Sequence, residues 1–314
     1  MRSPRRGRAR SRRRAPPDAP VTQATRRWRP IGSERESNWP DTSIGVRLSV
    51  ITDEIDARLG QSLDVCEELG LSAVELRTVD GVSIVDHQPD ALRTLRQELG
   101  RRGFRVSAIA SPFLKCDRGN DRLAQEGIHE HALDAAALLS APVVRAFSYW
   151  REPVPSVALP ELGDALHRAA ARAHDAGVTL ALENEHECNV ATSEEARAAL
   201  DAAASSHLRL IWDAGNAAML DRASFAGLGG LESIHDRVAH VHLKDVSASG
   251  HWTRIGDGII DFTALLLYLA EAGYDGYLSF ETHYQRDGSG EAATRDCIAS
   301  LRSIAAEAGV ELCA

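Results

Sequence analysis

Apolar and polar positions follow two alternating patterns along the chain from residue 46 onward. Short apolar runs rich in Val, Ile and Leu predict buried β-strands, and longer stretches with apolar residues every three or four positions predict amphipathic helices. Strands are predicted at 46–52, 73–77, 104–110, 143–147, 178–184, 208–213, 238–243 and 277–281. Helices between them are predicted, among others, at 89–102, 121–140, 159–176, 193–204 and 261–272.

The ends of these elements carry recognisable signals. Gly103, Gly177 and Gly273 stand where a helix stops and the next strand begins, and Thr192 precedes a helix with acids in its first turn. Eight strands alternating with helices over about 270 residues is the count and size of a (β/α)₈ barrel. A doubly wound sheet is disfavoured, because no strand-to-helix turn contains G-x-G-x-x-G. We therefore predict a single (β/α)₈ TIM barrel with its chemistry at the C-terminal ends of the strands.

Charge divides the chain into two parts. Residues 1–40 hold 12 arginines and only three acids, and the rest carries a net charge of −18. We predict a disordered basic tail over 1–43 and one barrel domain over 44–314. A dispensable tail is the favoured reading; a transit peptide, a nucleic-acid-binding arm and an upstream extension of the true start are the alternatives.

The acidic body makes nucleic acid a poor default partner, because phosphate binding relies on Lys and Arg. No apolar run approaches the roughly 20 residues that a membrane span needs. The five cysteines are scattered without a C-x-x-C pair, which favours reduced thiols in a cytoplasmic protein. We expect no nucleic-acid or membrane partner, and a homo-oligomer is compatible with this composition.

The last four predicted strands end in a distinctive set of side chains: Glu183, Asp213, His242 and Glu281. A lone acid at a strand end is commonly a helix N-cap or a solvated loop residue. Four such residues converging on an apolar barrel mouth need a counter-charge. Three carboxylates and an imidazole form a cage for one divalent ion, Mn²⁺ first, with Co²⁺, Mg²⁺ or Zn²⁺ as alternatives.

The stretch RVAHVHLKDV places two histidines on one face of the seventh strand. His242 lies near the C-terminal end of that strand. His240 lies about 6–7 Å deeper, at roughly 3.3 Å per residue. We predict one metal ligand, His242, and one buried supporting histidine, His240.

Several segments resemble the xylose isomerase-like TIM-barrel superfamily over about residues 46–306. They are LSVITDEI, GVTLALENEHE, LIWDAGNA, HVHLKDV and IGDGIIDFTALLLYLAEAGYDGYLSFETHY. This superfamily contains sugar and sugar-phosphate isomerases and epimerases, inosose dehydratases and AP endonucleases. The resemblance implies one divalent metal on Glu183, Asp213, His242 and Glu281, with Glu183 and Glu281 as the catalytic acid/base pair.

Two positions depart from the superfamily's epimerases that act on free ketoses. Those enzymes usually carry His where this chain has Asn216, and Arg where it has Ala248, although Arg254 is a candidate to replace that Arg. These differences argue against a free-ketose 3-epimerase. Glu185, two residues after Glu183, is the alternative ligand at that corner of the cage.

Four further side chains are candidates for substrate binding: Asn216, Lys115, Arg77 and Lys244. Asn216 offers hydrogen bonds to hydroxyls, and Lys115 and Arg77 offer positive charge to a carboxylate or phosphate. Each has a plainer alternative: a turn for Asn216, a solvated loop for Lys115, charge balance for Arg77 and Arg145, and an Asp245 pair for Lys244.

The predicted function is a divalent-metal-dependent isomerase or epimerase of a sugar, sugar phosphate or related polyol or keto compound. It would remove a proton α to a carbonyl through a metal-stabilised enediolate. The first alternative is a lyase, an inosose- or dehydroshikimate-type dehydratase on the same metal. An AP endonuclease and a non-catalytic sugar-binding barrel are less favoured.

Overall fold

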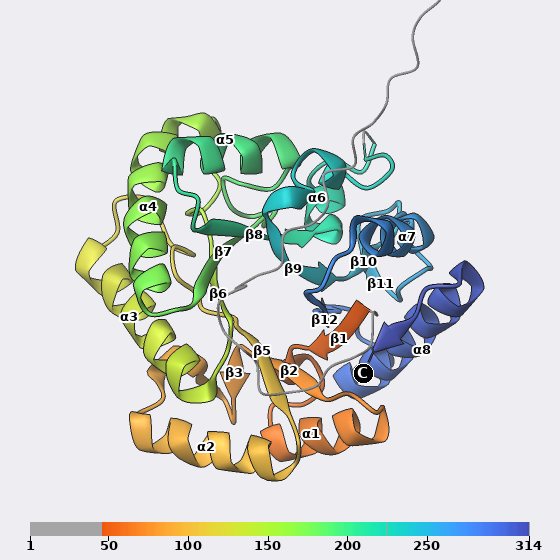
Figure 1. Ribbon diagram of the computed structural model, residues 1–314. Helices are drawn as coiled ribbons and strands as arrows, with labels where there is room; N and C mark the ends of the chain where they lie inside the picture. Colours follow the sequence, from red (N-terminus) through yellow and green to blue (C-terminus); the bar gives the residue numbers. More distant parts are fainter. Residues whose placement is uncertain (1–45, 224, 314) are drawn as a thin grey trace, which may run out of the picture.

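A barrel of parallel strands surrounded by helices forms the body of the protein (Figure 1). The computed structural model describes residues 46–223 and 225–313. The strands of the main sheet are β1 (Val46–Val50), β2 (Ala73–Leu76), β5 (Arg105–Ile109), β6 (Val143–Ala146), β7 (Thr179–Glu183), β8 (Leu208–Asp213), β9 (Val238–Leu243), β12 (Tyr277–Phe280) and β13 (Leu312–Cys313). Two short hairpins add β3 (Thr78–Val79) with β4 (Val82–Ser83), and β10 (Asp245–Val246) with β11 (Trp252–Thr253).

The strands follow one another around the barrel in the order β13-β1-β12-β9-β8-β7-β6-β5-β2. All neighbours in this sheet are parallel. An isolated parallel bridge between Ile51 and Glu75 joins the first two strands and closes the ring. The strands are buried almost throughout because side chains fill the interior and helices cover the outside.

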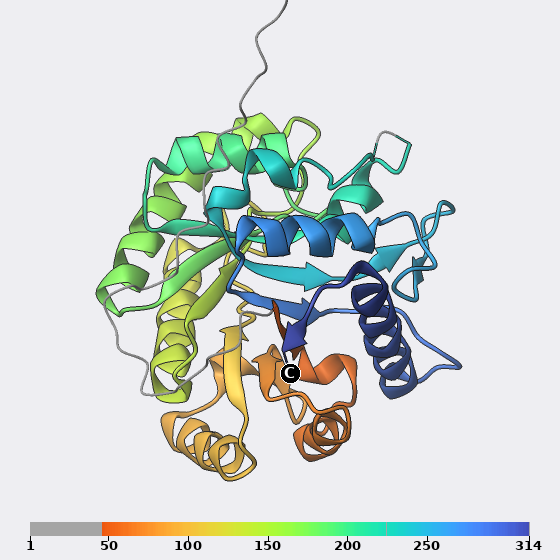
Figure 2. The ribbon, with the colours of Figure 1, turned by 45° about the vertical axis from the view of Figure 1, so that its right-hand side comes forward.

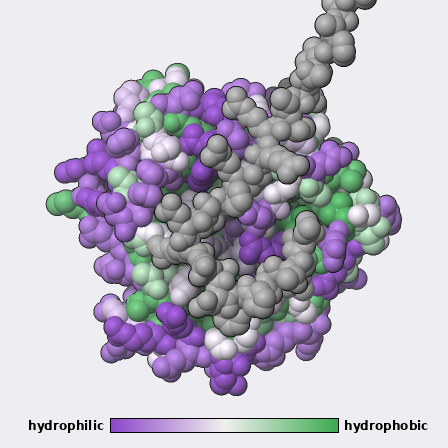
Figure 3. Space-filling view, in the orientation of Figure 1, coloured by the Kyte–Doolittle hydropathy of each residue, from purple (hydrophilic) through white to green (hydrophobic). Residues whose placement is uncertain are grey.

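The helices form the outer ring, and Figure 2 shows them beside the strands from the side. They are α1 (Leu59–Glu68), α2 (Pro89–Arg101), α3 (Arg122–Leu139), α4 (Leu159–Asp175), α5 (Ser193–Ala203), α6 (Ala214–Leu220), α7 (Phe262–Ala272) and α8 (Gly290–Ala308). Hydrophilic side chains dominate the outward surface that they present in Figure 3. Among the described residues, no helix is both long and apolar enough to cross a membrane.

The predicted TIM barrel is confirmed. Each of the eight predicted strands contains an observed strand whose ends lie within two residues, and the five predicted helices match within one residue. Gly103, Gly177 and Gly273 have φ of 79°, 72° and 73°, a backbone conformation that favours glycine after a helix. Thr192 forms a capping box with Glu195 at the start of α5.

Two parts of the prediction have a different outcome. The ninth strand, β13, extends the sheet beyond β1 and was not predicted, because two residues leave no periodicity to detect. The predicted disordered tail, residues 1–43, and its boundary with the barrel at residue 44 lie outside the described residues, so both stay predictions.

Candidate metal centre

The four residues at the ends of the last strands meet at one edge of the barrel. Glu183 and Asp213 are the final residues of β7 and β8, His242 lies in β9, and Glu281 follows β12. Asp213 and His242 are register partners across two neighbouring strands. Each residue offers one ligand atom, and these four atoms lie within 4.8 Å of one another. All four side chains are buried, with exposures between 0% and 4%.

Each carboxylate of this cage has an inward and an outward oxygen. The inward oxygens surround the imidazole: His242 Nδ1 lies 3.0 Å from Glu183 Oε1 and 3.4 Å from Glu281 Oε2. The outward oxygens accept hydrogen bonds from arginines. Arg145 Nη1 donates to Glu183 Oε2 at 3.1 Å, and Arg77 Nη1 donates to Glu281 Oε1 at 3.0 Å. The arginines therefore hold both carboxylates in one orientation and leave their inward oxygens for a ligand.

Asp213 is oriented by the helix that it begins. Its Oδ1 accepts the backbone N–H of Asn216 at 2.9 Å, as the N-cap of α6. Its Oδ2 is buried and accepts no well-aligned hydrogen bond from a described residue. The ammonium of Lys244 lies 2.9 Å from that oxygen and 2.8 Å from Glu281 Oε2. Lys244, a candidate substrate residue, thus lies against the cage, and the alternative pair with Asp245 is not formed.

The imidazole of His242 is held from below by a carboxylate in the barrel interior. Glu75, in the middle of β2, lies 3.1 Å from His242 Nε2 and 2.9 Å from His240 Nε2. Nε2 of His242 thus faces Glu75, and Nδ1 faces the inward oxygens of Glu183 and Glu281. Such carboxylate–histidine contacts commonly orient metal-binding histidines. His240 is fully buried beneath His242 and contacts Glu75 rather than the cage, as the depth argument predicts.

Burial and neighbouring charges shift the pKa values of three cage residues, Asp213, His242 and Glu281. Burial raises the pKa of Asp213 to about 6; Lys244 opposes this shift and Glu183 adds to it. Burial lowers the pKa of His242, but Glu75 and Glu183 outweigh it and raise that pKa well above its ordinary value. The pKa of Glu281 falls well below its usual range despite burial, because Lys244 and His242 favour the anion. Without a metal ion, His242 therefore favours its protonated form, and the ammonium of Lys244 lies against Asp213 Oδ2 and Glu281 Oε2.

The donor set fits a divalent ion. Three carboxylate oxygens and one imidazole nitrogen suit Mn²⁺, Co²⁺, Mg²⁺ or Zn²⁺, and each has its second atom fixed by a neighbour. An ion among these atoms would remove the need for a proton on His242 and would supply charge to Asp213 Oδ2. The residues that would hold it are Glu183, Asp213, His242 and Glu281.

A cavity of about 270 Å³ opens beside the cage on the side of the first strands. Its lining includes Arg77, Lys115, Arg145, Phe147, Glu185 and Glu281. Lys115 Nζ pairs with Glu185 Oε2 at 3.0 Å and lies 4.6 Å from the Phe147 ring centroid. Glu185, the alternative ligand, therefore faces Lys115 and is outside the four-residue cage.

Asn216 and Arg77 also lie at the cage, but both already have protein partners. Asn216 is fully buried; its amide donates to Glu183 Oε1 at 3.4 Å and lies 2.9 Å from His186 Nδ1. Arg77 pairs with Asp53 and Glu54 as well as with the cage. The substrate contacts predicted for Asn216, Lys115, Arg77 and Lys244 stay predictions, and charge balance describes the observed contacts of Arg77 and Arg145.

Sequence reasoning missed three groups at the site. Glu75 supports the ligand histidine, Glu54 pairs with Arg77, and His283 lies 3.2 Å from Glu54 Oε1. The one available signal was Glu75 itself, a charged residue in the middle of the apolar strand AVELR. Asp245 proved structural: its carboxylate accepts backbone N–H groups of Gly256, Gly258 and Ile260 and holds the GDGII turn. Arg254, the candidate replacement for the family Arg, pairs with Asp257 at the surface.

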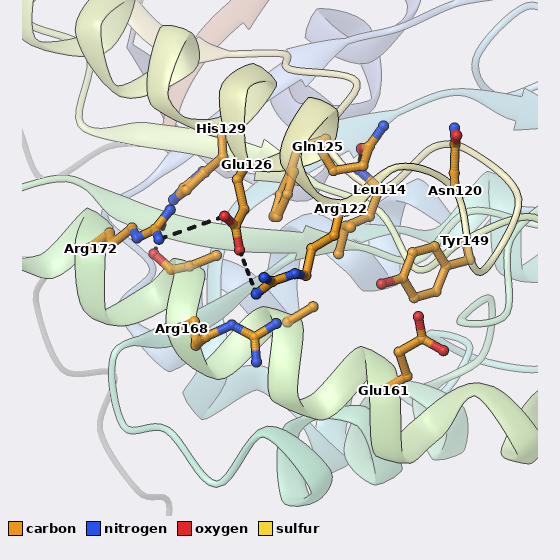
Figure 4. Close-up of a pocket in the computed structure, with 13 residues that line it drawn as sticks. Leu114, Asn120, Arg122, Gln125, Glu126, His129, Tyr149, Glu161, Arg168 and Arg172 are labelled. Carbon is orange, nitrogen blue, oxygen red and sulfur yellow. Dashed lines mark hydrogen bonds and ion pairs between the residues drawn. The ribbon is translucent and has the colours of Figure 1, made fainter.

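A second cavity, of about 80 Å³, lies outside the barrel between α3 and α4 (Figure 4). Among its charged side chains, Glu126 bridges Arg122 and Arg172. His129 is buried there and lies 3.1 Å from the backbone oxygen of Ala169. None of the predicted site residues lines this cavity, and no cluster of metal-binding atoms among the described residues falls in it.

Known proteins match this chain over most of the barrel. The profile of the xylose isomerase-like TIM-barrel family matches residues 63–304. A ketose 3-epimerase of Arthrobacter globiformis is 26% identical over 252 residues, which cover 76% of this chain and 83% of that enzyme. An inosose dehydratase of Geobacillus kaustophilus is 29% identical over 141 residues, 38% of this chain. That match spans only 44% of the dehydratase.

The fold also matches solved structures. A crystal structure of the IolI protein with a zinc atom bound superposes with a TM-score of 0.66 at 19% sequence identity. The match covers 84% of this chain and 98% of that one. At this level of identity, the likeness concerns the fold.

Proposed function

Because this chain belongs to the xylose isomerase-like TIM-barrel family, we propose that it is a divalent-metal-dependent isomerase or epimerase. Its substrate would be a sugar, a sugar phosphate or a related polyol or keto compound. One observation carries the proposal: Glu183, Asp213, His242 and Glu281 gather within 4.8 Å at the C-terminal ends of the strands. The ketose 3-epimerase relative supports it, and Mn²⁺ is the ion that we propose.

The chain's own groups suit proton transfer at carbon. A divalent ion in the cage would polarise a substrate carbonyl and stabilise the negative charge that develops when a neighbouring proton leaves. Glu183 and Glu281 approach from strands on either side of His242, so one carboxylate can take a proton and the other can return it. Arg145 and Arg77 hold the two carboxylates in place through hydrogen bonds to their outward oxygens. Return to the opposite face would invert the carbon.

Dehydration on the same site is the second candidate, favoured by the inosose dehydratase relative. Loss of a hydroxyl β to the carbonyl follows the same proton abstraction. Asn216 and Ala248 stand where free-ketose epimerases usually carry His and Arg, which argues against a free ketose as the substrate. We propose a cytoplasmic location, supported by five unpaired cysteines, four of them buried.

The test is hydrogen–deuterium exchange followed by NMR in D₂O. A panel of ketoses, their phosphates and inososes is incubated with the protein and Mn²⁺. We expect exchange at a carbon next to a carbonyl, loss of exchange with EDTA and recovery with Mn²⁺. Absorbance of a new double bond would identify the dehydratase.

Substitutions locate the activity. Glu183→Gln and Glu281→Gln should each reduce exchange by about 10²–10⁴-fold, the usual contribution of an acid or base. Glu187→Gln is the matched control, because Glu187 is an exposed acid of the same loop. Full exchange in both variants, or turnover without metal, would contradict the proposal. Ligand binding without exchange would indicate a non-catalytic sugar-binding barrel.

A further inference from the structure

Three cations contact the carboxylates of the cage, and they do not contact the same oxygens. Arg145 and Arg77 reach the outward oxygens, Glu183 Oε2 and Glu281 Oε1. The ammonium of Lys244 reaches Asp213 Oδ2 and Glu281 Oε2. These are inward oxygens, the atoms that a metal ion in the cage would share. Among the described lysines and arginines that contact the cage, Lys244 alone is placed to compete with the ion.

The position of Lys244 is built into the fold. The residue follows His242 by two positions, so both side chains leave the same face of the chain. It is 1% exposed. Its stem packs on Gly215, where a Cβ atom would lie only 2.6 Å from Lys244 Cγ. The Trp252 ring centroid lies 5.3 Å from Nζ. Any side chain larger than glycine at position 215 would therefore collide with the stem of Lys244.

We propose that Lys244 is a resident cation of the metal cage, which holds Asp213 and Glu281 in place without metal and weakens the binding of the ion. The inference rests on the metal site of the proposed function. It assigns Lys244 a role in setting metal affinity rather than in contacting the substrate.

The physical basis is competition for shared lone pairs. An ammonium within 3 Å of two ligand oxygens neutralises part of their negative charge. It also repels a divalent ion bound to the same atoms. Without the ammonium, the cage would attract the ion more strongly. The same change would leave buried carboxylates without a partner in the metal-free protein, which is costly.

The experiment measures Mn²⁺ binding by the EPR signal of the free ion, with Lys244→Met compared with the unchanged protein. We expect Lys244→Met to bind Mn²⁺ at least about tenfold more tightly, because a nearby positive charge is removed. Its metal-free form should melt at a lower temperature, and saturating Mn²⁺ should raise that temperature by more than in the unchanged protein. If the methionine variant does not fold without metal, Lys244→Gln removes the charge and keeps a hydrogen-bonding group.

Lys115→Met is the matched control. Lys115 lines the neighbouring cavity and pairs with Glu185, which lies outside the cage, so its loss should change Mn²⁺ affinity by less than about threefold. Unchanged or weaker Mn²⁺ binding by the Lys244 variants, or an equal gain in Lys115→Met, would overturn the inference. Absence of Mn²⁺ binding by the unchanged protein would instead overturn the proposed metal site, so the two failures are distinguishable.

Discussion

The two halves of the barrel mouth carry opposite charges. Strands β7, β8, β9 and β12 contribute the acids and the histidine of the cage. Strands β2 and β6, and the loop after β5, contribute Arg77, Arg145 and Lys115. The first group supplies the four residues of the cage, and the second, together with Lys244 after β9, balances their buried negative charge. Ligand groups and most of the compensating groups therefore come from different parts of the chain, and this division can be tested one residue at a time.

Removal of Arg145 should have the largest effect on folding. Arg145→Met would leave Glu183 as a buried carboxylate without its arginine and should lower the free energy of unfolding of the metal-free protein by about 3–5 kcal/mol. Urea denaturation measures this loss. Arg105→Met is the control, because Arg105 is an exposed arginine of β5 and should matter by less than about 0.5 kcal/mol. Equal losses of unfolding free energy in Arg145→Met and Arg105→Met would show that burial of the Arg145–Glu183 pair does not determine its contribution to stability.

Asp213 of the cage and Glu54, which pairs with Arg77, should respond to pH in opposite senses. The pKa of Asp213 is raised from 3.8 to about 6 by burial, so in metal-free protein its stabilising contribution is full below 3.8 and is lost as the pH rises through 6. Burial opposes the shift at Glu54, yet His283 and Arg77 lower its pKa from 4.5 to about 2. The contribution of Glu54 is full above 4.5 and is lost as the pH falls toward 2.

At pH 8, Asp213→Asn should therefore raise the free energy of unfolding, less the pairing that Lys244 loses, and Glu54→Gln should lower it by about 3 kcal/mol. Thermal and urea unfolding of metal-free protein across the pH range measure both. The effect of Asp213→Asn should vanish near pH 4, and that of Glu54→Gln near pH 2. Changes of the same sign in both variants would remove the electrostatic distinction between the halves.

Glu75 connects the halves, and its effect should appear in metal affinity. Glu75→Gln weakens the orientation of His242 and should reduce Mn²⁺ affinity by about 10–100-fold. Titration calorimetry measures it. Glu68→Gln, on the exposed surface of α1, should leave the affinity unchanged. An unchanged affinity in Glu75→Gln would mean that the four ligands alone determine binding.

The smallest effect is expected at Lys115. Its pair with Glu185 is partly exposed, so Lys115→Met should lower the free energy of unfolding by less than about 1 kcal/mol. The same urea experiment as for Arg145 measures it. A loss as large as that of Arg145→Met would show that the sign of the charge, rather than its burial, sets the contribution of the compensating groups.

The fold could be predicted nearly complete because its signals are local. A buried strand shows as an apolar run, a helix end shows as Gly273 or Thr192, and eight repeats leave few alternatives to a barrel. The grouping of Glu183, Asp213, His242 and Glu281 could also be predicted, since parallel strands bring their C-terminal ends to one edge.

Charge balance by Arg77 and Arg145 was one of the alternatives that the sequence offered, but the specific contacts of the compensating groups could not be predicted. The contact of Glu75 with His242 joins residues 167 positions apart, and that of Arg77 with Glu281 joins residues 204 apart. Neither follows from a spacing in the sequence. The sequence made Lys244 a candidate substrate residue. Its contact with Asp213 could not be predicted, because that contact depends on the position of α6 and on the space beside Gly215.

The bridge between Ile51 and Glu75 has a consequence for assembly of the protein. The backbone of Glu75 closes the ring between the first two strands, and its side chain contacts Nε2 of His242 on the opposite wall. We therefore expect the ring of strands to close before Glu75 can orient His242 for metal binding. The time at which metal uptake begins during refolding would then report when the ring closes, because uptake would begin only after the Ile51–Glu75 bridge has formed.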